Sequence, residues 1–312
     1  MGRLIDGDWK TDAELTENDR KQRQDTFRER IHSGSRFPPE PGRYHLYIAR
    51  ACPWAHGAVL VRALLGLEDA LSMDVVDPYR GANGWQFSPE KSGCTPDSLH
   101  GSDFLHEVYT EADPEFTGRV TTPVLWDRVE GTIVNNESIE IMETLSTAFG
   151  GHSDGADLYP EGKRDRIDAV VEELYEPINQ GVYTAGFADS QAVYEEAVRN
   201  LFDALDYWEE VLADQRFLVG DALTLADLRL FPALVRFDPV YHTHFKCTLQ
   251  RLVEYPNLWG YTRDIYQHDG VPATVNLDHI KEHYYQSHTA INPTGFVPVG
   301  PDIDFTAPHG RG

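Results

Sequence analysis

The sequence predicts an α/β domain followed by an all-helical domain, in a chain of 312 residues that is long enough for two cores. Two observations lead to this fold class. Between residues 41 and 150, short runs of β-forming residues alternate with apolar residues at helical spacing, and after Gly150-Gly151 only the helical spacing remains. Residues 1–40 are polar and charged and end in a proline-rich run, so we expect an N-terminal extension that wraps the surface.

The first predicted strand and helix enclose a cysteine. Residues 44–49 are rich in β-formers, Cys52 and Pro53 follow, and residues 58–65 have helical apolar spacing. This order puts Cys52 at a helix N-terminus, with Pro53 at or near the first helical position. The helix dipole and the free N–H groups there favour the thiolate, which is the form that attacks sulfur. A buried structural cysteine at a helix start is the alternative.

No second cysteine lies three residues after Cys52, where a C-x-x-C redox motif would have one. That position holds Ala55, so Cys52 has no local partner for a disulfide. We therefore expect a mixed disulfide formed on Cys52 to be resolved by a thiol from outside the chain.

The elements that follow complete both domains. They are a strand over 71–76, a long Gly-, Pro-, Ser- and Asp-rich insert over 77–118, a strand over 120–127, a turn at Glu130-Gly131, a strand over 132–134 and a helix that begins at 136–138. The order β-α-β, insert, β-β-α is that of a thioredoxin-like domain. In the helical domain, one helix is predicted over 193–212, and Thr224 with Asp227 forms a capping box at the start of another.

The chain is strongly acidic. Lys and Arg number 27 against 51 Asp and Glu, a formal net charge of −24, and only six of the basic residues are lysines. Such a surface repels nucleic acid and anionic membranes, so neither is an expected partner. An acid-rich, lysine-poor surface resembles those of proteins from salt-loving microbes, because high salt screens the self-repulsion. An acidic mesophilic protein is the alternative.

Several classes of protein are excluded. No run approaches the roughly 18 apolar residues of a membrane span, and the N-terminus shows no apolar signal region. Cys52, Cys94 and Cys247 do not form a disulfide framework, which fits a reducing cytoplasm, and their spacing does not suggest a metal site.

Seven motifs occur in a fixed order along the chain. They are Ala51–Ala55, Asn83–Trp85, Arg119–Asp127, Asn135–Ser138, Asn179–Tyr183, Arg236–Cys247 and His283–His288. Together they resemble the Xi class of glutathione transferases, the glutathionyl-hydroquinone reductases. The resemblance implies a thioredoxin-like thiol-binding domain over 41–150 and an all-helical glutathione-transferase domain for substrate over 151–312, in a homodimer. With the charge, it indicates an origin in a halophilic archaeon.

The resemblance implies a binding site for a γ-glutamyl thiol. Glu137 would receive the ammonium group of the ligand, and Ser138 with the helix N-terminus would receive its carboxylate. Thr122, before a Pro123 that is expected to be cis, would bind the cysteinyl unit through its backbone N–H and C=O. The implied thiol-binding residues are Trp85, Arg119, Val120, Thr121, Thr122, Glu137 and Ser138. Without the resemblance, Glu137-Ser138 would be simple helix capping and Trp85 a core residue.

The implied catalytic residues are Cys52, Tyr183, Tyr241 and Tyr284. Cys52 would attack the sulfur of a thiol–hydroquinone conjugate, and Tyr183 would deliver a proton to the ring carbon. Tyr241 and Tyr284 would stabilise the thiolate. Glutathione or γ-glutamylcysteine is the implied co-substrate, and no metal, flavin or nucleotide is needed. Gly57 replaces an arginine that is common in the family, and this removes a positive charge near Cys52.

Three other functions stay open. They are a general thiol transferase acting on protein mixed disulfides, a non-catalytic thiol-binding module of the same fold, and conjugation of a thiol to electrophiles. The Cys-Pro start, the Glu-Ser pair and the three tyrosines argue against the non-catalytic module. Conjugation is disfavoured, because it needs a hydrogen-bond donor to the sulfur of the ligand, whereas a nucleophilic cysteine traps the ligand covalently.

Overall fold

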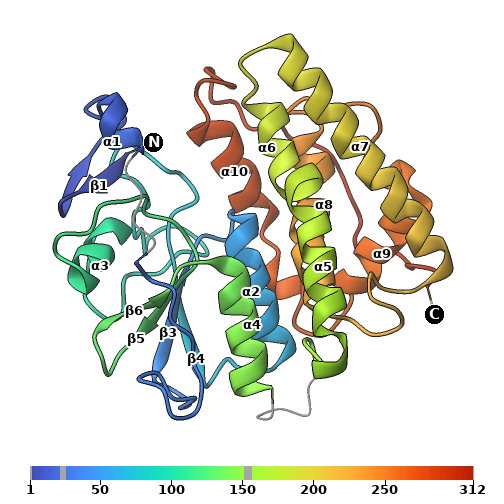
Figure 1. Ribbon diagram of the computed structural model, residues 1–312. Coiled ribbons are helices and arrows are strands. Elements are labelled where there is room, and N and C mark those ends of the chain that lie inside the picture. The colour runs from blue at the N-terminus through green and yellow to red at the C-terminus, as the bar shows by residue number, and fades with distance from the viewer. Residues whose placement is uncertain (1, 22–25, 151–156, 312) are drawn as a thin grey trace. The chain divides into compact units, whose positions relative to one another are not determined.

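The computed structural model describes residues 2–21, 26–150 and 157–311, which fold into two compact units (Figure 1). The first unit comprises residues 1–62 and 66–153, and the second comprises residues 63–65 and 154–312. Within the described residues, every strand belongs to the first unit, and the second unit is helical. The predicted fold class is confirmed.

The first unit is built on a four-stranded sheet in the order β4-β3-β5-β6. β3 (Tyr44–Ile48) is parallel to β4 (Leu71–Val75), β5 (Val124–Asp127) is antiparallel to β3, and β6 (Thr132–Asn135) is antiparallel to β5. Its helices are α2 (Pro53–Leu64), α3 (Leu105–Ala112) and α4 (Ser138–Phe149). All residues of β3 are buried, as expected for an inner strand, and α2 makes the crossover that the parallel pair requires.

The strand predicted over 120–127 is shorter in the structure. β5 begins at Val124, because Pro123 has no N–H to donate to a neighbouring strand. The peptide bond between Thr122 and Pro123 is cis, as expected from the sequence. The residues before Val124 therefore approach the sheet as a separate segment.

Two features of the first unit are not predicted by the sequence. The insert over 77–118 contains α3, whose buried positions Leu105, Val108 and Tyr109 have helical spacing. The N-terminal residues form a hairpin of β1 (Arg3–Ile5) and β2 (Asp8–Lys10), followed by the short helix α1 (Glu17–Lys21). Both features depend on contacts with residues far away in the sequence.

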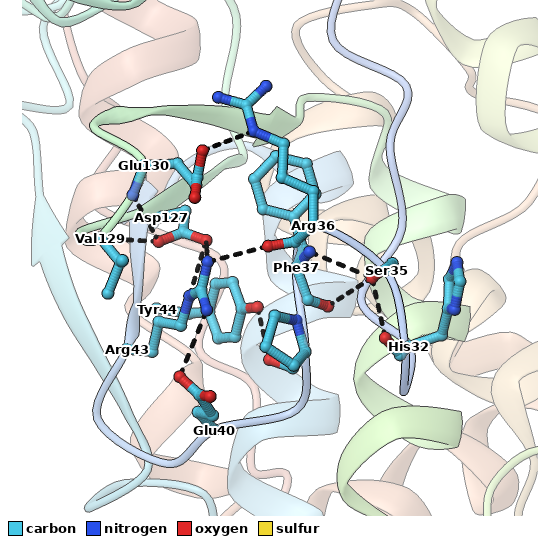
Figure 2. Close-up of polar contacts among 11 residues, drawn as sticks. His32, Ser35, Arg36, Phe37, Glu40, Arg43, Tyr44, Asp127, Val129 and Glu130 are labelled. Atoms are coloured by element: carbon cyan, nitrogen blue, oxygen red, sulfur yellow. Dashed lines mark hydrogen bonds and ion pairs between the residues drawn. The ribbon is translucent and has the colours of Figure 1, made fainter.

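A buried ion pair joins the chain before β3 to the sheet (Figure 2). Arg43 donates from Nε to Asp127 at 2.8 Å, its Nη2 lies 2.6 Å from the same carboxylate, and Asp127 is fully buried. The carboxylate also accepts from the backbone N–H groups of Val129 at 2.7 Å and Glu130 at 3.2 Å. Arg43 donates further to the carbonyl of Arg36 at 3.0 Å. Because both charges are buried, removing one partner alone would cost roughly 3–5 kcal/mol.

Helices make up the second unit. The α-helices are α5 (Arg164–Leu174), α6 (Gly181–Gly186), α7 (Gln191–Asp214), α8 (Leu225–Arg236), α9 (Pro256–Tyr266) and α10 (Leu277–Ser287). Short 3-10 turns are η1 (Glu161–Lys163), η4 (Leu252–Glu254) and η5 (Pro272–Thr274). α7 contains the helix predicted over 193–212. No described helix combines the length and the apolar character that a membrane-spanning helix needs.

The capping box predicted at the start of α8 is confirmed. Asp227 accepts from the backbone N–H of Thr224 at 2.8 Å and from its hydroxyl at 3.0 Å. The same carboxylate accepts from Leu218 N–H at 2.8 Å and from the hydroxyl of Tyr261 at 2.9 Å. Complete burial raises the pKa of Asp227, while these four hydrogen bonds oppose the rise. This carboxyl group therefore joins α8, α9 and the loop before α8.

Two π-helical segments interrupt the second unit. η2 (Tyr175–Gln180) lies between α5 and α6, and η3 (Phe237–Tyr241) follows α8 directly. Each contains a proline, Pro177 or Pro239, which cannot donate the usual helical hydrogen bond, and a widened turn accommodates this. η2 is joined to α8 by a bond from the Asn179 amide to the carbonyl of Arg229 at 3.2 Å.

Candidate active site

Cys52 lies at the start of α2, as predicted. α2 begins at Pro53, and the carbonyl of Cys52 accepts from His56 N–H at 3.1 Å, the first bond of the helix. Only 8% of the residue is exposed, and Sγ donates to the carbonyl oxygen of Thr122 at 3.5 Å. Since β3 and β5 are neighbours, the segments at their adjoining ends bring Cys52 and Thr122 together. The structure thus brings the predicted nucleophile and the predicted main-chain binding segment into contact.

The segment that contains Thr122 is fixed by a tyrosine that the sequence does not single out. The hydroxyl of Tyr109 donates to the carbonyl of Thr121 at 3.0 Å and accepts from Thr121 N–H at 3.3 Å. It also accepts from the side-chain amide of Asn136 at 3.2 Å. Tyr109 therefore joins residues 119–122 to the start of α4. The apolar spacing of α3 is the signal that could have revealed it.

Glu137 and Ser138 lie at the N-terminus of α4, where an anionic group is stabilised by the helix dipole. Glu137 occupies the N-cap position, and its backbone N–H donates to the side chain of Asn135 at 2.7 Å. Ser138 is the first residue of the helix and is buried. Asn135 also donates to Glu140 at 2.9 Å, so several polar contacts fix this helix start.

The remaining predicted thiol-binding residues belong to two loops of the first unit. Trp85 is buried, its carbonyl accepts from Leu105 N–H at 2.9 Å, and the guanidinium of Arg80 lies 5.3 Å from its ring centre. Arg119 is exposed, and Val120 after it is buried. The arginine therefore offers its charge to solvent or to a ligand, while Val120 anchors the loop.

The three predicted tyrosines come together within the second unit. The hydroxyls of Tyr183 and Tyr284 lie 2.5 Å apart, and those of Tyr241 and Tyr284 lie 3.2 Å apart. Tyr284 is therefore the central member, and both Tyr241 and Tyr284 are buried. Burial raises the pKa of Tyr284 well above its usual value, and the neighbouring hydroxyls add to this. Tyr284 is thus a neutral hydrogen-bonding group at physiological pH.

Aromatic side chains that the sequence assigns no role surround the tyrosines. Phe245 stacks on Tyr241 with 5.6 Å between ring centres and an interplanar angle of 5°. His244 and His288 share a hydrogen bond of 3.3 Å between Nε2 and Nδ1, and the His288 ring packs edge-on against Tyr284. Phe187 is 46% exposed and contacts both Phe245 and His288. Such a cluster of rings suits a flat aromatic ligand.

The other two cysteines lack the environment of Cys52. Cys247 is fully buried, and burial raises the pKa of its thiol to about 12. Cys94 is half-buried in the insert, and its thiol donates to the carbonyl of Val76 at 3.7 Å. Within the described ranges, no group of three or more His, Cys, Asp or Glu side chains is arranged to hold a metal ion.

Two family models match this chain. The N-terminal domain of glutathione S-transferase matches residues 51–148, and the C-terminal domain matches residues 191–264. With a thioredoxin-like sheet, a cysteine at the start of α2 and a helical second unit, the fold and the site are those of a glutathione transferase.

Relatives that match along nearly the whole chain identify the class of glutathione transferase. The Xi class glutathione transferase from Natrialba magadii is 55% identical with a TM-score of 0.95, over 100% of this chain and 96% of that one. The glutathione-bound structure of YqjG from Escherichia coli K-12 is 45% identical with a TM-score of 0.92, over 99% of each chain. Glutathionyl-hydroquinone reductase PcpF of Sphingobium chlorophenolicum is 50% identical over 96% of each chain. The chain belongs to the Xi class of glutathione transferases.

The pair of His244 and His288 predicts a pH dependence of stability. Burial, with a smaller contribution from the charge of Lys246, lowers the pKa of His244 to about 4, whereas an unfolded histidine has a pKa of about 6.5. Below pH 6.5 the unfolded chain binds a proton at this histidine that the folded chain does not bind. The free energy of unfolding therefore decreases as the pH is lowered. We expect a loss of about 2 kcal/mol between pH 7 and pH 5 from this group.

Urea unfolding of the wild type and of His244→Gln at pH 7 and pH 5 measures this contribution. The variant should be less stable at pH 7 and should lose about 2 kcal/mol less on acidification. His32→Gln, at an exposed position, is the matched control and should behave as the wild type. An equal loss in the wild type and in His244→Gln would contradict the assignment.

Proposed function

We propose that this chain is a thiol-dependent reductase that removes glutathione, or a related γ-glutamyl thiol, from thiol–hydroquinone conjugates. The observation that carries the proposal is the cysteine at the start of α2, with Sγ 3.5 Å from the Thr122 carbonyl, in a chain 50% identical to a glutathionyl-hydroquinone reductase. A position at a helix N-terminus favours the thiolate form of a cysteine, and the thiolate is the form that attacks sulfur.

The proposed reaction has two steps. In the first, the thiolate of Cys52 attacks the thioether sulfur, a sulfur–sulfur bond forms, and the carbon–sulfur bond breaks. The electron pair of that bond goes to the ring carbon, which takes a proton from Tyr183, so that hydroquinone leaves and the ligand thiol stays on Cys52. In the second step, the thiolate of another thiol molecule attacks the mixed disulfide and releases the thiol disulfide and free Cys52.

The thiol-binding residues are proposed from the contacts within the first unit. Glu137 would bind the ammonium group of the ligand, and Ser138 with the start of α4 its carboxylate. Thr122 would bind the cysteinyl unit through its backbone, a role supported by the hydroxyl of Tyr109, which bonds to both backbone groups of Thr121 and so holds this segment of the thiol site. Trp85, Arg119 and Val120 would line the rest of the ligand, and Arg119 supplies a positive charge.

The tyrosine cluster supports a role in proton transfer. Tyr284 has a raised pKa and one proton, so it accepts a hydrogen bond from one neighbouring hydroxyl and donates to the other. Tyr183 is half-buried, whereas Tyr241 and Tyr284 are buried. The half-buried hydroxyl is the one we assign to proton delivery, and we assign the buried pair to thiolate stabilisation.

We further propose the division into an extension over 1–40, a thiol-binding domain over 41–150 and a substrate domain over 151–312, in a homodimer. The three cysteines are free thiols, which fits a reducing cytoplasm. The acidic composition and the similarity to a Natrialba magadii protein support a salt-loving archaeal source. In such a cell γ-glutamylcysteine is a candidate for the thiol.

A general thiol transferase is the second candidate. Exchange at Cys52 would require only the thiol site proposed for the first unit, where Cys52 contacts Thr122 and Tyr109 holds Thr121. The tyrosine cluster would then have no catalytic role, so the two candidates differ in their dependence on Tyr183.

The first prediction concerns the nucleophile. Cys52→Ser should abolish reduction of thiol–hydroquinone conjugates, because serine is not a nucleophile toward sulfur at neutral pH. Cys94→Ser and Cys247→Ser are matched controls and should keep most of the activity. Turnover by chromatography and the intact mass after incubation with each thiol disulfide measure both effects. Near-normal turnover by Cys52→Ser would exclude this mechanism.

A second prediction concerns the thiol. The proposed residues bind the γ-glutamyl and cysteinyl units of the thiol. A ligand that lacks the terminal glycine should therefore lose only peripheral contacts. We expect γ-glutamylcysteine to support turnover at least comparable with glutathione in high salt, measured as kcat/KM with conjugates of each thiol. A strong preference for glutathione would contradict both this placement and the archaeal source.

A third prediction separates the two candidate functions. Tyr183→Phe should slow conjugate cleavage by roughly 10²–10⁴-fold, the usual contribution of a general acid, and should leave disulfide exchange at Cys52 nearly intact. Exchange needs no carbon protonation, so only cleavage depends on this hydroxyl. Tyr207→Phe, at an exposed position on α7, is the control for loss of a tyrosine hydroxyl. Equal losses in both reactions for Tyr183→Phe would show that the proton-donor assignment is wrong.

A further inference from the structure

The N-terminal hairpin has no role in the proposed function, yet it is tightly built into the first unit. β1 pairs with β2 through Leu4 and Trp9, and the turn between them contains Asp6 and Gly7, both with positive φ. Leu4 is fully buried. A Cβ at Gly7 would lie 2.0 Å from the carbonyl oxygen of Pro114, so the turn packs directly on the chain before Arg119.

The hairpin is hydrogen-bonded to the segment that leads into Arg119. Leu4 and Gly118 exchange two backbone bonds of 3.0 Å, and Gly7 N–H donates to the carbonyl of Phe116 at 3.1 Å. Asp6 N–H donates to the hydroxyl of Thr117 at 2.8 Å. Residues 116–118 therefore lie along β1 like a further strand, and the next residue is Arg119.

The same hairpin also covers the loop that leads into Trp85. The indole N–H of Trp9 donates to the carbonyl of Ala82 at 3.2 Å, and a Cβ at Gly84 would lie 3.0 Å from the Trp9 ring. Gly84 has a φ of +82°, which glycine adopts without strain. The hairpin also contacts α3, where the His106 ring stacks on the Trp9 ring with 4.8 Å between the ring centres. Figure 1 shows the hairpin in blue beside α3.

We propose that the N-terminal hairpin is a positioning element of the thiol site, which fixes Trp85 and Arg119 through the residues directly before them. This inference rests on the thiol-binding role proposed for those two residues. They are far apart in sequence and belong to loops without regular secondary structure. The hairpin bonds to both loops, so it holds them in one arrangement before a ligand binds, which reduces the entropy cost of binding.

The hairpin also carries an arginine, Arg3, whose pKa responds to the charge of Arg119. Arg3 on β1 is buried, and after burial itself the charge of Arg119 is the main cause that lowers the pKa of Arg3. The guanidinium of Arg3 donates to the carbonyl of Arg20 at 2.8 Å, which holds it close to the hairpin. The charge of Asp19 opposes this shift in the pKa of Arg3, so a carboxylate of the N-terminal segment partly balances the positive charge of Arg3.

The test uses S-methylglutathione, which binds as the thiol does but forms no disulfide. We expect Trp9→Ala to raise its Kd about tenfold, the loss that one misplaced contact causes. Trp9→Phe, which keeps a ring over Gly84, should restore most of the affinity. Asp8→Ala, at an exposed position on β2, is the matched control and should bind as the wild type. Thr117→Val, which removes the two hydrogen bonds between this hydroxyl and Asp6, should weaken binding through the loop of Arg119.

Further readouts distinguish positioning from general damage. In all four variants, alkylation of Cys52 without ligand and kcat at saturating thiol should stay within about twofold of the wild type, because Cys52 does not contact the hairpin. Unchanged Kd in both Trp9→Ala and Thr117→Val would overturn the inference and leave the proposed function standing. A parallel fall in alkylation rate and affinity would also overturn it. Absence of S-methylglutathione binding to the wild type would overturn the proposed function as well.

Discussion

The contact between Sγ of Cys52 and the carbonyl oxygen of Thr122 is the constraint on which the organisation of the first unit depends. The proposed nucleophile must face the backbone segment that is proposed to bind the thiol ligand, and Sγ does so while only 8% of Cys52 is exposed. Two neighbouring strands meet this requirement, since β3 leads into Cys52 and β5 starts just after Thr122. Tyr109 then holds the Thr122 segment, and the helix start at Ser138 lies beyond it in the same hydrogen-bonded chain.

Most of the fold could be predicted because its signals are local. The Cys52-Pro53 helix start and the capping box of Asp227 each depend on residues within a few positions of one another. Assigning the two units to a glutathione transferase also needed the seven motifs and their order along the chain. Neither the local signals nor the motifs depend on contacts between distant residues.

The missed features are those made by residues far apart in sequence. The hydroxyl of Tyr109 forms hydrogen bonds with Thr121 and Asn136. Its structural role depends on these contacts and not on the residues next to it in the sequence. His244 and His288 likewise form a pair only after α10 has packed on η3. The sequence predicts an N-terminal extension that wraps the surface but does not predict the hairpin in it, because this polar, charged segment shows no long alternation and each strand has only three residues. Short elements of this kind are stabilised by tertiary contacts and leave little trace in the pattern.

The acidity of the chain changes which ion pairs matter. In concentrated salt, exposed pairs such as Arg36–Glu130 are screened and contribute little. Buried pairs are screened much less, and here they use arginine, whose planar group binds a carboxylate through two parallel bonds. Arg43 and Asp127 form a buried pair in which two guanidinium nitrogens contact one carboxylate oxygen, and Arg216 forms the two parallel bonds with Asp264, although its side chain is 37% exposed. A strongly acidic chain is thus combined with interior ion pairs that salt screens much less than exposed ones.

The two π-helical segments affect the helical register of the second unit. A π turn holds one residue more than an α-helical turn, and one residue corresponds to a rotation of about 100° around a helix. Tyr183 follows η2 by three residues, and Tyr241 is the last residue of η3. Deleting one residue from either segment would convert its π turn into an α-helical turn and leave the residues after it on the same face, whereas the same deletion in a regular α-helix would rotate them by that angle. The two π turns therefore each take up one extra residue without changing the register of the helix that follows.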